Sequence, residues 1–258
     1  MAVNVKTEII DKQILKDDIV KLKINSKEIA DIAKPGNFLE IRVSDNIEPL
    51  LRRPISIYNI DKENGTLEFI FQIKGKGTKI LAQKNIGEKI DVIGPLGFGT
   101  FDVRPYKKVA ILGGGIGIFP LYELAKQLQS DITTYLGFRN KDYVLLEDEF
   151  KNVSNNVVIT TDDGSYANSG FAINYLENDC IKEKPDIIFA CGPLPMLRAV
   201  KKFSEENDII CQISLEEKMG CGIGACLGCA VKVIKDGTEK YGHVCKQGPV
   251  FFANEVEI

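Results

Sequence analysis

Four cysteines near the C-terminus constrain this chain more than any other feature of its sequence. Cys221, Cys226 and Cys229 follow the spacing C-x4-C-x2-C, and Cys245 comes after fifteen further residues. This is the plant-type spacing of a [2Fe–2S] cluster with a distant fourth thiolate. Four glycines between positions 220 and 228 remove Cβ atoms, permit positive φ and let backbone N–H groups approach the sulfurs. The segment therefore predicts a loop that holds a [2Fe–2S] cluster through these four thiolates.

The same cysteines have two other interpretations, a zinc ribbon and a group of buried thiols. Zinc sites of this kind more often combine two C-x2-C pairs, whereas this chain has one, formed by Cys226 and Cys229. The density of glycine also suits a loop that wraps around an inorganic core. Because an iron–sulfur cluster carries one electron at a time, the rest of the chain should show where the electrons come from.

Length, charge and cysteine content limit the class of protein. A chain of 258 residues is long enough for two or three compact units, and its net charge of -3 favours neither a nucleic-acid nor a membrane-surface partner. The N-terminus lacks the apolar core of a signal peptide, and no apolar run reaches membrane-spanning length. Seven cysteines, four of them grouped as ligands, predict a reducing cytoplasm. The single histidine, His243, is assigned no catalytic role.

Residues 1–103 are expected to form a small antiparallel β-barrel. Apolar residues alternate loosely through 9–24 and more regularly through 38–43 and 66–73, which is typical of half-buried strands. Turn residues such as Pro35-Gly36 separate these short runs. The sequence Gly94-Pro-Leu-Gly-Phe-Gly99 breaks the pattern and indicates a domain boundary near Asp102 to Tyr106.

Two stretches of the expected barrel carry chemistry. In Arg53-Pro54-Ile55-Ser56, an arginine beside a proline-stiffened strand can bind a phosphate or the edge of a flavin. Taken alone, this stretch would be better explained as a surface arginine on a strand. Gly77-Thr78 precedes an expected helix with Thr78 as its N-cap, which would form an anion site, although a glycine-rich hairpin end is the alternative. Together the two stretches describe a site for a dinucleotide with an extended pyrophosphate.

In residues 104–213, the apolar pattern changes to the alternation of strands and helices that is typical of an α/β domain. The apolar run 108–112 predicts a buried parallel strand, which leads into a glycine loop and then a helix. The usable loop pattern is Gly115-x-Gly117-x-x-Pro120, with proline in place of the third glycine of the usual fingerprint. Proline suits the first turn of a helix, so the loop could still present N–H groups to a pyrophosphate.

The alternation of strands and helices continues to the end of this domain. Further strands are expected at 132–138, 156–160, 186–190 and 211–215, and helices at 169–176 and 195–204. Cys191-Gly192-Pro193 follows one of these strands directly, at an end where open parallel sheets bind ligands. Cys191 is either an inert buried thiol or a residue that faces a nicotinamide, and the sequence leaves both open.

Residues 214–258 are expected to form a small cluster module. The run 230–234 and a turn at Asp236-Gly237 predict a hairpin that returns the chain to Cys245. The expected fold class is thus multidomain β plus α/β: an antiparallel barrel, a nucleotide-binding α/β domain and a C-terminal [2Fe–2S] module.

These motifs together resemble the ferredoxin–NADP reductase superfamily and, within it, the electron-transfer subunits of class-B dihydroorotate dehydrogenases. The resemblance rests on Arg53-Pro-Ile-Ser56, Gly77-Thr78, the Gly115–Pro120 loop, Cys191-Gly-Pro193 and the cluster segment from Glu217 to Cys229. It implies that the barrel binds FAD, the α/β domain binds NAD and the C-terminal module binds [2Fe–2S]. It also implies FAD contacts from the strand Ile70-Phe71-Gln72.

The resemblance further assigns roles and a partner. Arg53 and Ser56 would position the flavin and its phosphates, the Gly77 amide and Thr78 would hold the pyrophosphate, and the loop at Gly115 and Gly117 would hold NAD. The chain shows no second flavin site or base to oxidise dihydroorotate. The resemblance therefore implies an FMN-containing catalytic subunit in a heterotetramer of two plus two, which acts in pyrimidine (UMP) biosynthesis.

Competing interpretations remain at the level of function. Small subunits of NADH-dependent ferredoxin–NADP reductases and of sulfide dehydrogenase-type complexes share much of the same architecture, and a zinc-bearing binding module on a nucleotide-binding scaffold is a third possibility. Arg139 follows the second strand of the α/β domain, where a 2′-phosphate would be read. A single arginine is more often a solvated charge, so we expect NAD rather than NADP.

Overall fold

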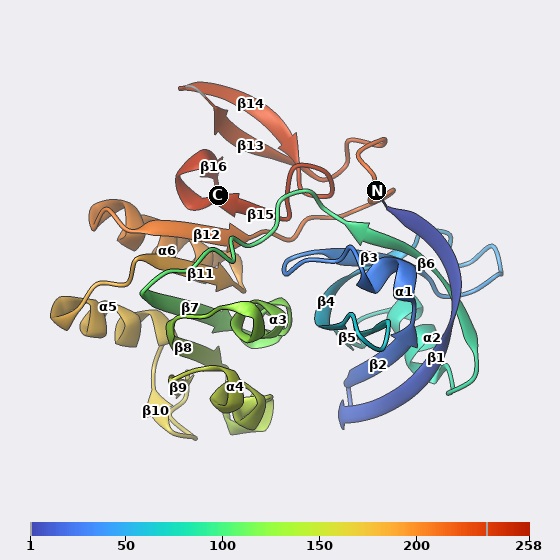
Figure 1. The fold of residues 1–258 in the computed structure, drawn as a ribbon, viewed down its shortest axis with the longest axis horizontal. Coiled ribbons are helices and arrows are strands. Elements are labelled where there is room, and N and C mark those ends of the chain that lie inside the picture. The colour runs from blue at the N-terminus through green and yellow to red at the C-terminus, as the bar shows by residue number, and fades with distance from the viewer. Residues whose placement is uncertain (1, 236) are drawn as a thin grey trace. The chain divides into compact units, whose positions relative to one another are not determined.

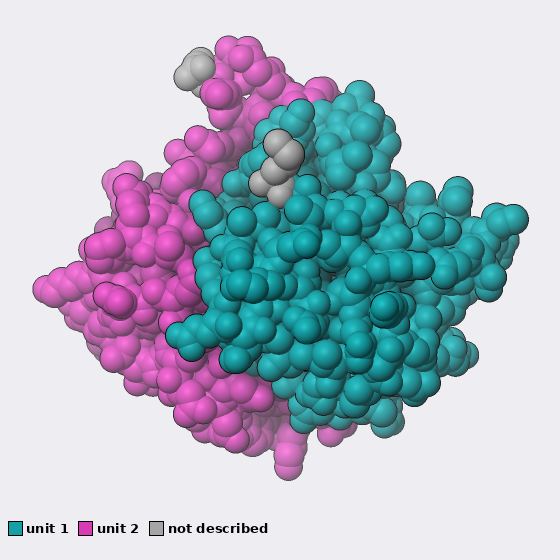
Figure 2. All heavy atoms as spheres, turned by 45° about the vertical axis from the view of Figure 1, so that its right-hand side comes forward, with its two compact units in different colours: residues 1–100, 216–230, 243–249 teal, residues 101–215, 231–242, 250–258 magenta. Residues whose placement is uncertain are grey.

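The computed structural model describes residues 2–235 and 237–258, and its contacts divide the chain into two compact units, coloured separately in Figure 2. Unit 1 comprises 1–100, 216–230 and 243–249, and unit 2 comprises 101–215, 231–242 and 250–258. The cysteine loop thus groups with the N-terminal segment, although more than a hundred residues separate them in sequence.

Unit 1 is built on a closed, six-stranded antiparallel barrel, which confirms the predicted fold of this segment (Figure 1). The strand order is β1-β2-β5-β4-β3-β6. The strands are β1 (Val3–Lys16), β2 (Ile19–Asn25), β3 (Phe38–Arg42), β4 (Arg53–Asp61), β5 (Thr66–Gln72) and β6 (Lys89–Leu96). Two short helices accompany them, α1 (Lys27–Ala30) and α2 (Lys76–Gln83).

The barrel core follows from the period-2 pattern of its strands. Leu67, Phe69 and Phe71 lie on one face of β5 and belong to the buried apolar cluster inside the barrel. On β3, the core residues are Leu39 and Ile41, so the residue between them points outward. This alternation decides which side chains of the barrel can meet the cysteine loop.

The expected break at Gly94 is wrong, because residues 94–96 continue β6. Gly94 lies against the barrel core, where a Cβ would come within 2.5 Å of Leu39 Cδ2. Pro95 falls beside an irregularity in the β3–β6 ladder between Phe38 and Glu40. A proline without an N–H group is tolerated where the ladder is interrupted, so the strand runs through both residues.

The expected N-cap of α2 is also wrong. Gly75 is the N-cap, and Thr78 lies three residues further along, inside the first turn. The Thr78 hydroxyl reaches back and accepts hydrogen bonds from the backbone N–H groups of Lys74 (3.0 Å) and Gly75 (3.2 Å). Thr78 therefore fixes the entry of the chain into the helix from the third helical position.

Unit 2 contains a seven-stranded sheet in the order β10-β9-β8-β7-β11-β12-β15. All neighbouring strands are parallel except β12 and β15, which are antiparallel. The strands are β7 (Lys108–Gly114), β8 (Asp131–Phe138), β9 (Asn156–Thr161), β10 (Asn168–Ser169), β11 (Ile187–Cys191), β12 (Ile210–Ser214) and β15 (Val250–Phe252). This sheet confirms the predicted α/β fold.

Helices cover both faces of the sheet, because the chain proceeds from β7 outward to β9 and then returns to β11 and β12 on the other side. The α-helices are α3 (Phe119–Gln127), α4 (Glu147–Val153), α5 (Ala172–Lys182) and α6 (Leu194–Glu206), and the 3₁₀ turns are η1 (Gly115–Ile118), η2 (Lys141–Tyr143) and η3 (Ala253–Glu255). The strand order reverses between β7 and β11, which makes this pair the topological switch point of the sheet (Figure 1).

The helix expected at 169–176 begins later and runs longer, as α5 from Ala172 to Lys182. Ser169 is instead in the short strand β10, which pairs with β9. Gly170 has φ +97°, so the chain turns sharply there before the helix can start.

The C-terminal part contains a small three-stranded sheet of β14-β13-β16. Its strands are β13 (Ala230–Lys235), β14 (Thr238–His243) and β16 (Val256–Glu257). The expected hairpin is therefore present, although Asp236 of its predicted turn lies outside the described residues. Within the described ranges, no helix is long and apolar enough to cross a membrane.

Candidate functional site

The four predicted cluster ligands lie together in unit 1 as two pairs of thiols. Cys229 and Cys245 are buried, and their sulfurs are 3.2 Å apart. Cys221 is half-buried, and the thiol of the exposed Cys226 donates to its sulfur. In the part of the chain that the structure describes, no three His, Cys, Asp or Glu side chains converge on a single-ion site. Paired thiols are the arrangement that a two-iron cluster requires.

Backbone N–H groups of the loop already point at these sulfurs. Ile223, Ala225 and Cys226 donate to Cys221 Sγ at 3.4, 3.3 and 3.4 Å, respectively. Gly224 N donates to Cys245 Sγ at 3.1 Å. Such N–H···S bonds stabilise thiolates, so the donor set and the loop fit an iron–sulfur cluster.

The pKa values of two cluster cysteines differ for physical reasons. Burial raises the pKa of Cys221, but the N–H groups of Ile223, Cys226 and Ala225 outweigh burial and lower it to about 6. Burial and the neighbouring Cys229 thiol raise the pKa of Cys245 to about 12. The exposed side of the loop thus favours a thiolate, whereas the buried side requires the metal to displace the proton.

Two glycines of the loop have positive φ and close neighbours. Gly222 has φ +70°, and a Cβ there would lie 2.4 Å from Glu40 Cγ. Gly224 has φ +81°, and its Cβ would lie 2.7 Å from Lys246 Cδ. The positive φ favours glycine at both positions, and at Gly222 the buried Glu40 side chain also leaves no room for a Cβ.

The structure brings together the two predicted flavin stretches. Arg53 begins β4, and a Cβ on Gly77 of α2 would lie 2.2 Å from Arg53 Nε. Arg53 Nη1 donates to the backbone oxygens of Leu51 and Arg52, both at 2.9 Å. The guanidinium is thereby held over the N-terminus of α2, where a phosphate would meet both a cation and helix N–H groups.

The other predicted flavin residues differ in which atoms they can present to a ligand. Ile55 and Phe71 belong to the barrel core, so they can present only backbone atoms to a ligand. Pro54 and Ser56 lie on the outer face of β4, and Ile70 is buried outside the core cluster. Gln72 Nε2 donates to Asp18 Oδ2 at 2.7 Å.

The predicted nicotinamide residues meet at the switch point of unit 2. Cys191, the buried last residue of β11, pairs in register with Gly113 on β7. A Cβ on Gly117 would lie 2.6 Å from the Cys191 backbone oxygen, and a Cβ on Gly192 would lie 3.0 Å from Gly114 Cα. Gly115 has φ +53° with open space around it. The two glycine-containing turns, after β7 and after β11, thus pack closely against each other at the edge of the sheet where a ligand would bind.

One residue of the cluster region, Glu40, escaped the sequence predictions. It lies on β3, is 1% exposed and contacts the cysteine loop at Gly222. The sequence offered no signal for this burial, because a carboxylate between the apolar residues Leu39 and Ile41 of a strand is the ordinary pattern of a side chain that faces solvent.

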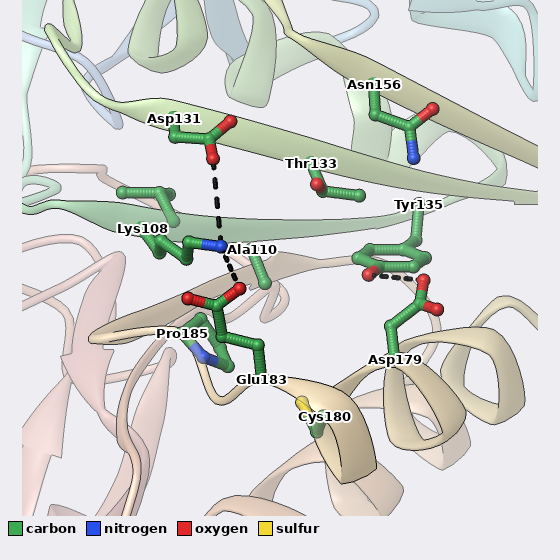
Figure 3. Close-up of a pocket in the computed structure, with 11 residues that line it drawn as sticks. Lys108, Ala110, Asp131, Thr133, Tyr135, Asn156, Asp179, Cys180, Glu183 and Pro185 are labelled. Carbon is green, nitrogen blue, oxygen red and sulfur yellow. Dashed lines mark hydrogen bonds and ion pairs between the residues drawn. The ribbon is translucent and has the colours of Figure 1, made fainter.

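A polar hollow of about 250 Å³ lies at the opposite end of the unit 2 sheet, where the strands begin (Figure 3). Tyr135 Oη donates to Asp179 Oδ2 at 3.0 Å, and Lys108 pairs with Glu183 and, at 4.0 Å, with Asp131. Ligands of open parallel sheets bind at the other end, so this hollow is separate from the nucleotide site.

Comparison with known families identifies three regions. The model of the "iron-sulfur cluster binding domain of dihydroorotate dehydrogenase B" matches residues 216–257. The "oxidoreductase FAD-binding domain" matches residues 6–101, and the "oxidoreductase NAD-binding domain" matches residues 111–202. These matches confirm the predicted cofactor set of FAD, [2Fe–2S] and NAD. The chain is therefore an iron–sulfur flavoprotein oxidoreductase with a ferredoxin reductase-like fold.

Relatives of the whole chain narrow this class. The dihydroorotate dehydrogenase B (NAD(+)) electron transfer subunits of Lysinibacillus sphaericus and Geobacillus thermodenitrificans are each 40% identical, over 95% and 96% of both chains, respectively. A solved structure of an NADH-dependent reduced ferredoxin–NADP oxidoreductase, studied for electron bifurcation, is 32% identical with a TM-score of 0.85. It covers 98% of this chain and 90% of its own. The chain belongs to the family of dihydroorotate dehydrogenase B electron transfer subunits.

Proposed function

We propose that this chain carries electrons between NAD and a catalytic partner subunit that oxidises dihydroorotate to orotate in UMP biosynthesis. The observation that carries the proposal is the combination, in one chain, of the thiol loop, the flavin stretch at Arg53 and Gly77 and the glycine edge at Gly117 and Cys191. The 40% identity to dihydroorotate dehydrogenase B electron transfer subunits over almost the whole chain supports this choice of reaction.

The chemistry of the three groups explains why all three are needed. Nicotinamide exchanges two electrons as hydride, a [2Fe–2S] cluster exchanges one, and a flavin does both, so bound FAD connects the other two. The residues of the chain bind and orient these groups. We assign three sequence segments to them: 1–103 to FAD, 104–213 to NAD and 214–258 to the cluster.

Individual residues have distinct roles in this proposal. Arg53 and Ser56 orient the flavin and its phosphates, while the Gly77 amide and Thr78 hold the pyrophosphate at the start of α2. The close contact between Arg53 and Gly77 supports a shared phosphate site. Further FAD contacts come from 54–55 and 70–72.

The remaining roles concern NAD and the cluster. Gly115, Gly117, Cys191 and Gly192 form the edge that receives NAD, and Cys221, Cys226, Cys229 and Cys245 ligate the cluster. The N–H groups of 223–226 stabilise the cluster thiolates, which is supported by their bonds to Cys221 and Cys245.

The partner in this proposal is an FMN-containing catalytic subunit, in a heterotetramer of two plus two. Exposed apolar side chains at Ile223 and Leu227 flank the thiols and supply a surface for such a partner. NAD is preferred over NADP, and four free thiols reserved as ligands fit a reducing cytoplasm.

A Cys226→Ser variant tests the electron path. The variant should lose the visible absorbance of the cluster and the dihydroorotate-dependent reduction of NAD in the reconstituted complex, while NADH oxidation by small dyes persists through FAD. The matched control is Cys180→Ser, because Cys180 is a buried cysteine of α5 in unit 2 and is not one of the four predicted ligands. Unchanged partner exchange in Cys226→Ser would contradict the proposed path.

A second function is favoured by one observation. The similarity to the NADH-dependent reduced ferredoxin–NADP oxidoreductase structure, with its TM-score of 0.85, supports a small subunit of a ferredoxin-linked complex. An oxygen-free pull-down with this chain as bait separates the two functions. Capture of an FMN-bearing subunit that oxidises dihydroorotate supports the first function, whereas capture of a larger flavoprotein that reduces NADP with ferredoxin supports the second.

A further inference from the structure

Glu40 is a carboxylic acid buried between the barrel and the cysteine loop of unit 1. Its neighbours Leu39 and Ile41 point into the barrel core, so the Glu40 side chain leaves the outer face of β3. It is 1% exposed, and a Cβ on Gly222 would lie 2.4 Å from its Cγ and 2.5 Å from its Oε1. The carboxyl group is thus covered by the residue next to Cys221.

Both carboxyl oxygens lack a hydrogen-bond partner among the described residues. The two nearest cations are engaged elsewhere: Arg52 Nη2 lies 2.8 Å from Asp91 Oδ1, and Arg53 donates to backbone oxygens. A buried acid without a donor is costly, and titratable groups perturbed in this way cluster at functional sites.

Glu40 also lies between two of the proposed cofactor sites. It pairs in register with Pro54 on β4, next to the flavin residue Arg53. The charged groups that act on it are Arg52, Cys221 and Arg53. One carboxyl group is therefore close to both the flavin stretch and the first cluster cysteine.

We propose that Glu40 is a positioning residue that sets the reduction potential of the cluster through its negative charge on the barrel side of the loop. This inference rests on the proposed function, because it requires a cluster on the four cysteines. It assigns a role to a barrel residue that is not a ligand and that lies far from the loop in sequence.

The direction of the effect follows from electrostatics. Reduction adds negative charge to the cluster, and a carboxylate in a medium of low dielectric constant opposes that addition. The ionised form of Glu40 thus holds the potential low, which favours passing the electron onward. Replacing the carboxylate by a neutral group of the same shape should raise the potential.

The test is an EPR-monitored redox titration of the reconstituted holoprotein. Burial raises the pKa of Glu40 to about 7, so measurement at pH 9 keeps the carboxylate ionised. E40Q and E40M, two neutral variants of similar length, should both shift the cluster midpoint to more positive values, whereas E40D should stay near wild type. Should one neutral variant fail to fold, the other still provides the comparison.

The control variant is E68Q, which removes the same charge from the same barrel. Glu68 lies on β5, two strands away from β3, and forms ion pairs with Lys21 and Lys23. Its midpoint should match that of wild type. If the midpoints of E40Q and E40M equal that of E68Q, the inference is overturned. It is also overturned if E40D shifts the midpoint as much as E40Q and E40M do, because that result would indicate an effect of packing rather than of charge.

A different measurement, the presence of the [2Fe–2S] signal in the wild-type protein, tests the proposed function. A wild-type protein that shows no [2Fe–2S] signal after reconstitution would overturn the proposed cluster and, with it, the role of Glu40. A normal wild-type signal with an unshifted E40Q midpoint would overturn the role of Glu40 alone.

Discussion

At the scale of single residues, the cysteine loop depends on glycines for two separable reasons. Gly222 has φ +70° and lies against Glu40, whereas Gly87 has φ +89° and no atom within 4 Å of an added Cβ. Both positions carry the conformational cost of a left-handed backbone for any other residue. At Gly222, but not at Gly87, an added Cβ would also overlap a neighbouring side chain. That neighbour is Glu40, which is buried and has little room to move.

We therefore expect G222A to destabilise the protein more than G87A. The G87A variant should lose about 1 kcal/mol from the left-handed conformation alone. The G222A variant should lose about 3 kcal/mol because overlap with Glu40 is added. Urea unfolding followed by circular dichroism measures both, and the iron content of the reconstituted variants shows whether the loop still binds its cluster. Equal losses in the two variants would mean that Glu40 moves aside freely.

At the scale of elements, a polar contact in the hollow where the strands of unit 2 begin joins β8 to α5. Tyr135 is buried on β8, and its hydroxyl donates to Asp179 on α5 at 3.0 Å (Figure 3). Burial and the hydrogen bond to Asp179 raise the pKa of Tyr135 above its usual value. The folded protein therefore keeps the phenol proton at a pH where the unfolded chain releases it.

This pKa shift predicts how stability depends on pH. Above pH 10 the unfolded state binds fewer protons than the folded state at this residue, so the free energy of unfolding decreases as the pH rises. Y135F should lose about 1 kcal/mol at pH 7, where the hydrogen bond is intact. Above pH 10 its stability should decrease less steeply than that of wild type. Urea midpoints between pH 7 and 11 measure this, and parallel curves for the two proteins would contradict it.

At the scale of the whole molecule, the last segment of the chain contributes to both units. Residues 243–249 group with the barrel and 250–258 with the α/β unit. β15 pairs with β12 through Gln212–Phe252, Ile213–Phe251 and Ser214–Val250. Val250 and Phe251 are buried, so the edge of the nucleotide-binding sheet is completed by the end of the chain.

Truncation before Val250 should therefore weaken the α/β unit. Loss of the buried apolar residues Val250, Phe251, Ala253 and Val256 costs about 6 kcal/mol, which corresponds to a decrease of about 15 °C in Tm. The truncated protein should keep its FAD, since the barrel is closed without this segment. A control chain that ends at Val256 loses only the last two residues. Differential scanning calorimetry with FAD absorbance measures the outcome, and an unchanged Tm in the shorter chain would contradict the role of β15.

Much of this molecule could be predicted from local patterns. The period-2 runs at 38–43 and 66–73 predicted barrel strands, and the run 108–112 followed by Gly115 and Gly117 predicted the nucleotide-binding unit. These predictions succeed because strand alternation and the strand–glycine–helix order depend on residues that are neighbours in sequence. The cysteine spacing predicted a cluster for the same reason, since most of the ligands lie in one short loop.

Other features required the tertiary structure. The sequence could not show that Glu40 lies against Gly222, that Arg53 lies over Gly77, or that β15 completes the sheet beside β12. The entry to α2 and the course of β6 through Pro95 were also decided by neighbouring elements rather than by local preference. Each of these contacts joins segments that are distant in the chain, and its geometry is set by how the strands close and pair. The sequence by itself determined which cofactors the chain can bind, and folding decided which side chains surround them, because burial and charge are properties of the assembled neighbourhood.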